Sequence, residues 1–159
     1  MTDQPFVTCL WFDTEAEAAA TFYTGIFPGS KLGSILRHTE AGPGPTGSVQ
    51  LVEFELNGQK FSALNGGPAF TFNEAISVVV QCQDQAEVDY YWDRLTDGGQ
   101  EIACGWLRDK YGLCWQIVPT AFFDMVRDPD QDAVTRVMRA MYTMTKFDLA
   151  ALEKAYASD

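Results

Sequence analysis

Histidine, basic residues and long apolar runs are all scarce in this chain of 159 residues. The single histidine is His38, which excludes any site that needs two imidazoles. Lys and Arg number 11 against 22 Asp and Glu, and the formal net charge of −11 disfavours nucleic acid and anionic membrane surfaces as partners. No apolar run approaches the ~20 residues of a membrane span, and residues 1–5 show no sign of a secretory signal. We therefore expect a soluble, cytoplasmic protein.

Cysteine is too sparse to define a disulfide scaffold at this length. The four cysteines are scattered and form no CxxC pair of the kind that holds zinc: Cys9, Cys82, Cys104 and Cys114. We expect reduced, mostly packed thiols. The hydrophobic content of 47% is ordinary for a globular domain with a core of its own.

The first half of the chain has the pattern of a strand, a helix and three further strands. Residues 6–12 are β-branched and aromatic, and Asp13 or Thr14 is placed to cap a helix over residues 15–26. A short strand is expected at residues 31–39. Two more, at 49–56 and 60–64, flank Asn57-Gly58, a strong hairpin signal. The order is βαβββ.

A similar order follows after residue 75. Residues 76–82 form a buried-type strand, residues 84–95 a helix pattern, and residues 101–107 and 113–118 the remaining strand candidates. Setting Asp84 over Asp13 brings the helices and their glycine stops into approximate alignment. The sequence therefore predicts two modules with one plan.

Beyond residue 119 the apolar period becomes helical. Helices are expected at 121–127 and 149–156, and between them Asp128 is placed to cap a third helix before Pro129. This middle helix carries an apolar stripe from Val134 to Met141 that must be covered.

Two βαβββ modules resemble the vicinal oxygen chelate superfamily, which includes glyoxalases, extradiol dioxygenases and bleomycin-type resistance proteins. Residues 11–23, 52–82 and 104–119 are similar to the PhnB-like branch, often described as demethylubiquinone methyltransferase-like, and residues 144–149 of the tail also resemble it. The resemblance implies an α+β fold with a glyoxalase-like domain at residues 1–119. Its modules would span 5–67 and 75–119, followed by a helical C-terminal extension at 120–159.

The methyltransferase description does not agree with the glycine pattern. Transfer from S-adenosylmethionine normally uses a doubly wound sheet with a Gly-rich turn that opens a helix. The Gly-rich segments here, residues 42–47 and 66–67, both lie between strand candidates. The sequence therefore argues against methyl transfer.

The superfamily's metal enzymes use His, Gln or Glu from the first and last strands of each module. The positions that resemble those ligands hold no imidazole and no carboxylate: Thr8, Ala63 or Asn65, Ser77 and Gln116. Hydroxyl and amide groups leave the charge of a divalent ion uncompensated. We expect no catalytic metal and no cofactor.

Strand alternation around these positions, together with an aromatic side chain near the last strands, predicts a largely neutral ligand pocket. Its expected residues are Thr8, Leu10, Asn65, Ser77, Val79, Trp106 and Gln116. The alternative is that Thr8, Ser77 and Gln116 only satisfy one another as core polar groups. His38 could act as a general base if the Gly-Pro loop after it folds over a cleft. No catalytic residue is identified.

Three functions stay open at this point: a small-molecule-binding protein, a metal-dependent lyase, isomerase or dioxygenase, and an antibiotic-sequestering resistance protein. The first agrees best with the neutral pocket. A homodimer is expected, because open sheet edges and the stripe from Val134 to Met141 need cover. The stripe could instead pack within its own chain.

Overall fold

The computed structural model describes residues 6–158, and it shows an α+β protein made of two compact units. The boundary between the units falls between Phe72 and Asn73. Each unit contains one four-stranded mixed sheet and one helix packed on it, so the expected pair of βαβββ modules is confirmed. The helical extension belongs to the second unit.

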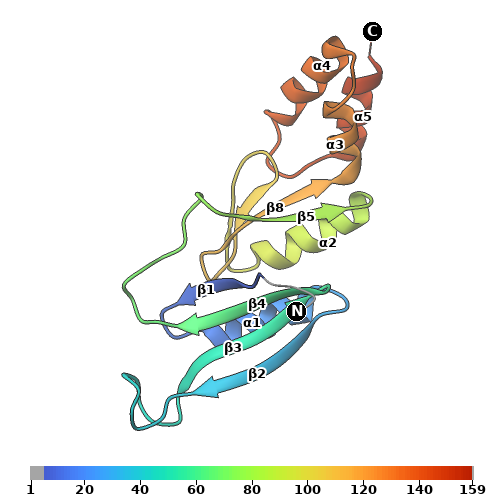
Figure 1. Cartoon of the computed structure of the whole chain (residues 1–159). Coiled ribbons are helices and arrows are strands. Elements are labelled where there is room, and N and C mark those ends of the chain that lie inside the picture. Colours follow the sequence, from blue (N-terminus) through green and yellow to red (C-terminus); the bar gives the residue numbers. More distant parts are fainter. Residues whose placement is uncertain (1–5, 159) are drawn as a thin grey trace. The chain divides into compact units, whose positions relative to one another are not determined.

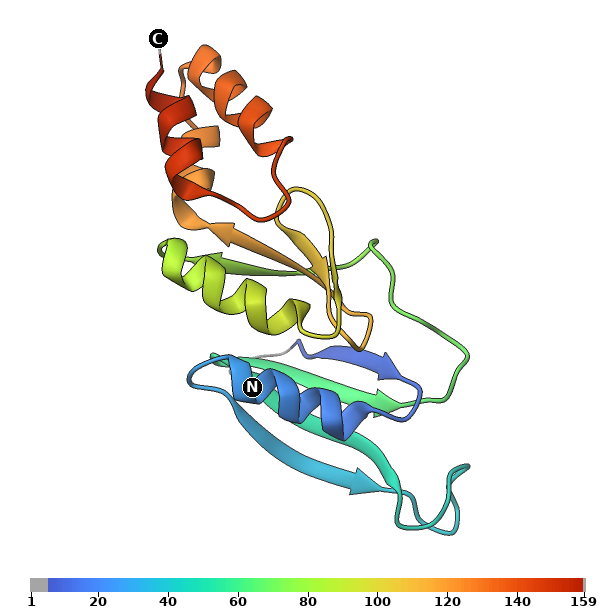
Figure 2. The same cartoon turned by 180° about the vertical axis from the view of Figure 1, so that it is seen from behind.

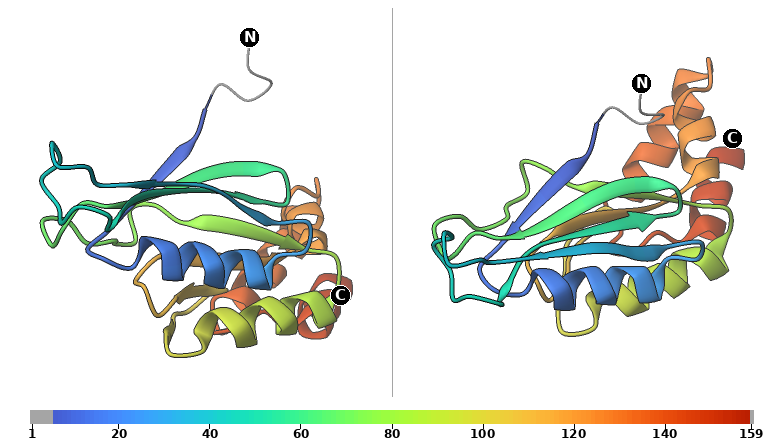
Figure 3. Two further views of the ribbon diagram at one scale, coloured as in Figure 1. Left: turned by 90° about the horizontal axis from the view of Figure 1, so that it is seen from below. Right: turned by 60° about the horizontal axis from the view of Figure 1, so that its bottom comes forward.

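The first unit comprises β1 (Thr8–Phe12), α1 (Ala16–Ile26), β2 (Lys31–Arg37), β3 (Val49–Leu56) and β4 (Gln59–Asn65). The strands lie in the order β1-β4-β3-β2, with β1 parallel to β4 and the other pairs antiparallel. Helix α1 covers one face of this sheet, as Figures 1 and 3 show. The turn between β3 and β4 is the expected Asn57-Gly58 hairpin, in which both residues have positive φ.

The core of the first unit lies between α1 and its sheet. Tyr23 of α1 is fully buried, and its ring centroid lies 6.2 Å from that of Phe54 on β3. Phe54 in turn stacks on Phe61 of β4 at 5.3 Å. These contacts identify the sheet face that α1 covers.

The second unit repeats the order with shorter strands. It comprises β5 (Val78–Cys82), α2 (Gln85–Thr96), β6 (Gln100–Glu101), β7 (Trp106–Arg108) and β8 (Cys114–Pro119), in the sheet order β5-β8-β7-β6. Figure 2 shows α2 lying along one face of this sheet. Asp84 caps α2, because its Oδ1 accepts a hydrogen bond from the Glu87 backbone at 2.9 Å.

The single strand expected at residues 101–107 is wrong, because the structure has two strands there. Cys104 and Gly105 both take positive φ and reverse the chain between β6 and β7. The reversal is held by backbone bonds from Ile102 to the Trp106 carbonyl and from Trp106 to the Ala103 carbonyl. Non-glycine residues rarely adopt positive φ, so the sequence pattern around Cys104 gives no sign of a turn there.

The tail comprises α3 (Thr120–Val126), α4 (Gln131–Met141) and α5 (Leu149–Ala157), which pack on one another. Val137 and Met141 of the apolar stripe are buried, whereas Val134 and Met138 are half-buried. The stripe is therefore covered largely within its own chain. None of the helices in the described residues is both long enough and apolar enough to cross a membrane.

Two expected helix caps are corrected by the structure. The residue that caps α4 is Asp130, not Asp128, and its carboxylate accepts from the backbone of Asp132 and Ala133. Neither Asp13 nor Thr14 caps α1. The first helical N–H, at Ala16, instead donates to Oδ1 of Asn65 at 2.8 Å, 49 residues away. A cap supplied by another strand leaves no local sequence signal.

Candidate functional site

Thr8 and Leu10 lie on the sheet face that α1 covers. Thr8 is paired with Phe61, and Leu10 with the fully buried Ala63. Paired residues share a sheet face, and Phe61 belongs to the aromatic contacts made with α1. Leu10 is only 5% exposed, so its side chain packs in the core of the first unit.

Asn65 has both ends of its side-chain amide engaged within the first unit. Besides accepting from Ala16, the amide donates through Nδ2 to the Val49 carbonyl at 3.0 Å. These two bonds tie β4 to the start of α1 and to the start of β3. Asn65 therefore has a structural role, and its part in a ligand pocket stays a prediction.

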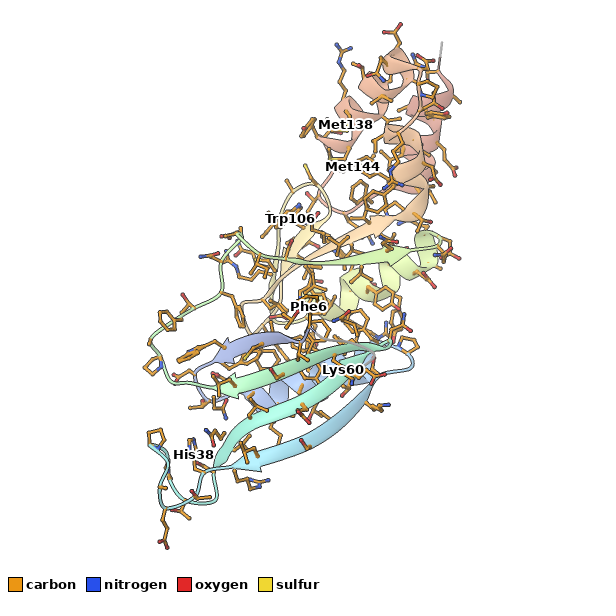
Figure 4. All side chains as sticks on the ribbon, in the orientation of Figure 1. Phe6, His38, Lys60, Trp106, Met138 and Met144 are labelled. Atoms are coloured by element: carbon orange, nitrogen blue, oxygen red, sulfur yellow. The ribbon has the colours of Figure 1, made fainter. Side chains whose placement is uncertain are left out.

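The other expected pocket residues gather on one face of the second sheet. Gln116 of β8 is paired with Val79 of β5 on one side and with Trp106 of β7 on the other. Nε2 of Gln116 donates to the Ser77 hydroxyl at 2.8 Å. Figure 4 marks Trp106 among the side chains of this region. The structure thus brings together four of the seven expected residues.

This face of the second sheet is partly open, because Cys114 and Val118, two residues on either side of Gln116 on β8, are buried on it whereas its other residues are not. The intervening residues Leu107, Trp115 and Ile117 are buried on the opposite side, where α2 contacts β7 and β8. In contrast, Val79 is 43% exposed, and Ser77, Trp106 and Gln116 are half-buried. The alternative, in which the polar groups only satisfy one another, is also met in part, because Ser77 and Gln116 bond each other.

An ion pair borders this face and was missed in the sequence. Arg108 is paired with Cys114 across the sheet, and its guanidinium bonds the Glu74 carboxylate. The Cys114 side chain and then Glu74 raise the pKa of Arg108, while a bond to its own backbone and the charge of Arg108 lower the pKa of Glu74. Arg108 lies two residues after Trp106, a spacing that places both side chains on one strand face. This spacing could have identified Arg108 as a residue of the site from the sequence.

We call this surface the second-sheet face and define it by Ser77, Val79, Trp106, Arg108 and Gln116. It offers a hydroxyl, an amide, an indole and an isopropyl group beside a guanidinium whose charge Glu74 balances. Such a mixture of apolar surface with a few fixed polar groups is typical of small-molecule sites. It can bind and orient a ligand, but it contains no imidazole and no unpaired carboxylate for proton transfer.

The superfamily's metal does not fit the residues that would hold it. Between residues 6 and 158 no three side chains of His, Cys, Asp or Glu converge. Of the positions that resemble the metal ligands, Ala63 is fully buried and has no donor atom, and Asn65 is committed to backbone groups. Ser77 and Gln116 bond each other. No chemical step through a metal can be built on this donor set.

Two βαβββ modules with one strand order define the vicinal oxygen chelate fold. Structures of low sequence identity show the same fold. Protein PA1353 of Pseudomonas aeruginosa is 17% identical with a TM-score of 0.60, covering 74% of this chain and 98% of its own. The fosfomycin resistance protein FosX of Listeria monocytogenes is 13% identical with a TM-score of 0.56, covering 78% and 97%.

The family follows from two closer matches. The family model described as 3-demethylubiquinone-9 3-methyltransferase matches residues 4–118. The PhnB protein of Bacillus cereus is 36% identical with a TM-score of 0.68, and the match covers 74% of this chain and all of that one. The chain belongs to this PhnB-like family. No curated protein gives a significant match.

Proposed function

We propose that this protein binds a small organic molecule at the second-sheet face and that it does so without a catalytic metal. The observation that carries the proposal is the Ser77–Gln116 hydrogen bond of 2.8 Å on an otherwise half-open face beside Trp106 and Val79. The bond fixes the orientation of two polar groups next to apolar surface, which lowers the entropic cost of binding.

Methyl transfer is not part of the proposal, although the family model carries that description. A doubly wound parallel sheet normally binds S-adenosylmethionine at a Gly-rich turn that opens a helix. In the described chain both sheets are four-stranded and mixed. The residues before α1 and α2, Glu15 and Asp84, are not part of a glycine-rich turn.

A bulky substitution on the second-sheet face tests the proposal. A ligand is first identified by thermal-shift screening of a small-molecule library against the wild-type chain. Ser77→Phe should then lower its affinity at least tenfold, while costing only about 1 kcal/mol of stability through the lost hydrogen bond. The matched control is Ser34→Phe on β2, an exposed serine of the first unit. Equal affinity of the wild type and a folded Ser77→Phe variant would remove the site.

A homodimer belongs to the same proposal. With the stripe on α4 largely covered, its support comes from edge strand β2, where Leu32 and Leu36 are 41% and 54% exposed. Exposed apolar edges invite pairing with another chain. Light scattering should give about twice the chain mass of 17.7 kDa, and Leu36→Lys should lower it. A wild type that stays at the single-chain mass at micromolar concentration contradicts the dimer.

We also place the protein in the cytoplasm, which agrees with four cysteines that form no disulfide among the described residues. Mass spectrometry after alkylation of freshly lysed cells should find all four thiols reduced. A disulfide formed before lysis would contradict this location.

A further inference from the structure

A cavity lies in the first unit, at the ends of its strands. The cavity has a volume of about 670 Å³. Its walls come from the end of β1, the loop after β2, the start of β3 and the end of β4. The residues that matter below are Trp11, Asp13, His38 and Leu64. The volume falls within the range of about 300–1,000 Å³ that is usual for small-molecule sites.

His38 is held inside the loop of residues 38–48, where Figure 4 labels it. The loop is closed by two backbone bonds, from His38 to the Ser48 carbonyl at 2.9 Å and from Gly47 to the His38 carbonyl at 2.8 Å. A Cβ atom at Gly42 would come within 2.8 Å of Nδ1, and one at Gly44 within 2.5 Å of the ring. The two glycines therefore let the backbone enclose the imidazole.

The imidazole is buried, and one of its two ring nitrogens has no hydrogen-bond partner. His38 is only 9% exposed, and its Nδ1 is fully buried with no hydrogen-bond partner. A buried polar atom of this kind needs an explanation. A bare Nδ1 acceptor costs less than a bare N–H, so the favoured tautomer carries its proton on Nε2 and offers one donor to a ligand.

Charge and aromatic surface indicate the chemistry of that ligand. Asp13 is exposed and is the only Asp, Glu, Lys or Arg among the residues that line the cavity. The Trp11 indole is fixed by a bond from Nε1 to the Gly67 carbonyl at 2.9 Å and by an edge contact with Phe70 at 5.1 Å. A carboxylate beside a fixed indole favours a cation with a flat body.

We infer that this cavity is a binding site for a planar organic cation, separate from the second-sheet face. The cation pairs with the Asp13 carboxylate and lies against Trp11, and Nε2 of His38 donates to an acceptor atom of the ligand. Leu64 and the loop prolines supply apolar walls. Anions are disfavoured because no basic side chain lines the cavity apart from the imidazole.

Three acridines of similar shape test the charge preference on the intact chain: 9-aminoacridine as the cation, acridine as the neutral probe at pH 8, and 9-acridinecarboxylate as the anion. Fluorescence titration should show the cation binding at least fivefold more tightly than the neutral probe, with no measurable binding of the anion. Equal binding of cation and anion, or no binding of the cation, would overturn the inference.

Variants locate the site. Asp13→Asn should weaken 9-aminoacridine binding about fivefold, whereas Asp97→Asn, an exposed aspartate of the second unit, should change nothing. Equal loss in both variants would show that only the overall negative charge attracts the probe, and would overturn the site. His38→Phe keeps a ring in the loop while removing its nitrogens, and should weaken binding of the cation about threefold; unchanged affinity would overturn the role of the imidazole.

An NMR readout separates this site from the proposed function. The Nε1–H signal of Trp11, assigned with Trp11→Phe, should shift on addition of 9-aminoacridine. The corresponding signals of Trp92 and Trp115, which bond Glu101 and Asp109, should stay in place. Ser77→Phe should leave the titration unchanged, and a loss of acridine binding in that folded variant would assign the probe to the second-sheet face instead.

Discussion

The first unit builds its sheet from three long strands of seven, eight and seven residues, β2 to β4, whereas the corresponding β6 to β8 have two, three and six. The shorter sheet is supported by the tail. Cys104 donates to the Met144 carbonyl and Gly105 to the Thr145 carbonyl, both at 2.8 Å. One topology can therefore be stabilised either by strand length or by a segment added after the sheet.

Helix α2 is also tied to the tail, while α1 is tied to its own sheet. The Gln85 amide donates to the Phe147 carbonyl at 3.1 Å and accepts from the Leu149 backbone at 2.8 Å. In the first unit, Asn65 of β4 makes the corresponding link to α1. The family model ends at residue 118, so the stabilising segment of the second unit lies beyond the range it matches.

The largest effect is expected where the tail meets the second sheet. Gly105 has a φ of +78°, and a Cβ there would lie 2.3 Å from the Phe147 ring. Gly105→Ala should therefore lower the stability of the second unit by about 3 kcal/mol, the sum of backbone strain and overpacking. Hydrogen exchange resolved by unit should show faster exchange in residues 73–158 and little change in residues 6–72.

The matched control is Gly58→Ala in the β3–β4 turn. Gly58 has a φ of +86°, but nothing lies within 4 Å of its added Cβ. It should cost only about 1 kcal/mol, and the cost should fall on the first unit. Similar losses in the two variants would mean that the contact with Phe147 does not stabilise the second unit.

A smaller loss is expected at Asp109, which organises the β7–β8 turn. It is 3% exposed, accepts from the Tyr111 and Leu113 backbone through Oδ1, and accepts from the Trp115 indole through Oδ2 at 2.8 Å. Asp109→Asn should cost about 2 kcal/mol, because its amide nitrogen would face the indole N–H. Chemical denaturation measures this. The exposed Asp124→Asn is the control, and an equal effect of both would refute the account of the turn.

Acid should also destabilise the second unit, by a smaller amount than the substitutions above. Hydrogen bonds from Lys146 and Gln85 lower the pKa of Asp89 below its ordinary 3.8. The stability from this pair is therefore present above pH 3.8 and is lost as the pH falls through the lower folded value. The pair is about half exposed, so solvent screens it and it should contribute only a few tenths of a kcal/mol.

Asp89→Asn isolates this contribution. The difference in unfolding free energy between the wild type and the variant should be largest above pH 3.8 and should shrink as the pH falls below it. Exposed Asp93→Asn on the same helix controls for the general change in charge. A difference that does not change with pH would show that the pair acts through packing instead of charge.

The two units should also differ in the reactivity of their cysteine thiols. Cys9 on β1 is exposed, whereas burial, followed by the charges of Glu87 and Asp84, raises the pKa of Cys82 on β5 to about 12. At pH 8 an aromatic disulfide reagent should modify Cys9 rapidly and leave Cys82 unmodified, because the thiolate is the reactive form. Cys9→Ser should remove the fast phase. A fast phase that survives would place the reactive thiol elsewhere.

Much of the fold could be predicted from local patterns. Asn57-Gly58 located a hairpin, Asp84 located the start of α2, and the repeated strand and helix order gave both modules. The cap that Asn65 provides to α1 could not be predicted, because its partner lies 49 residues away. The turn at Cys104 was missed because its φ of 61° is unusual for cysteine.

The sequence predicted which residues of the candidate site share a strand face, but not which face of each sheet is covered. Alternation correctly groups Ser77 with Val79 and Thr8 with Leu10, since neighbours on one strand face are two residues apart. It does not say which face the helix covers. In the second sheet the grouped residues lie on the partly open face, and in the first sheet they lie beneath α1, because a shift of one residue exchanges the two faces.

Metal-free binding at the second-sheet face is tested most directly by calorimetry of a screened ligand before and after exhaustive chelation. The wild type should bind with one affinity in both states, and Ser77→Phe should bind at least tenfold more weakly in both, because the Ser77 hydroxyl and the Gln116 amide already bond each other. Binding that disappears on chelation and returns with one equivalent of zinc or manganese would contradict this.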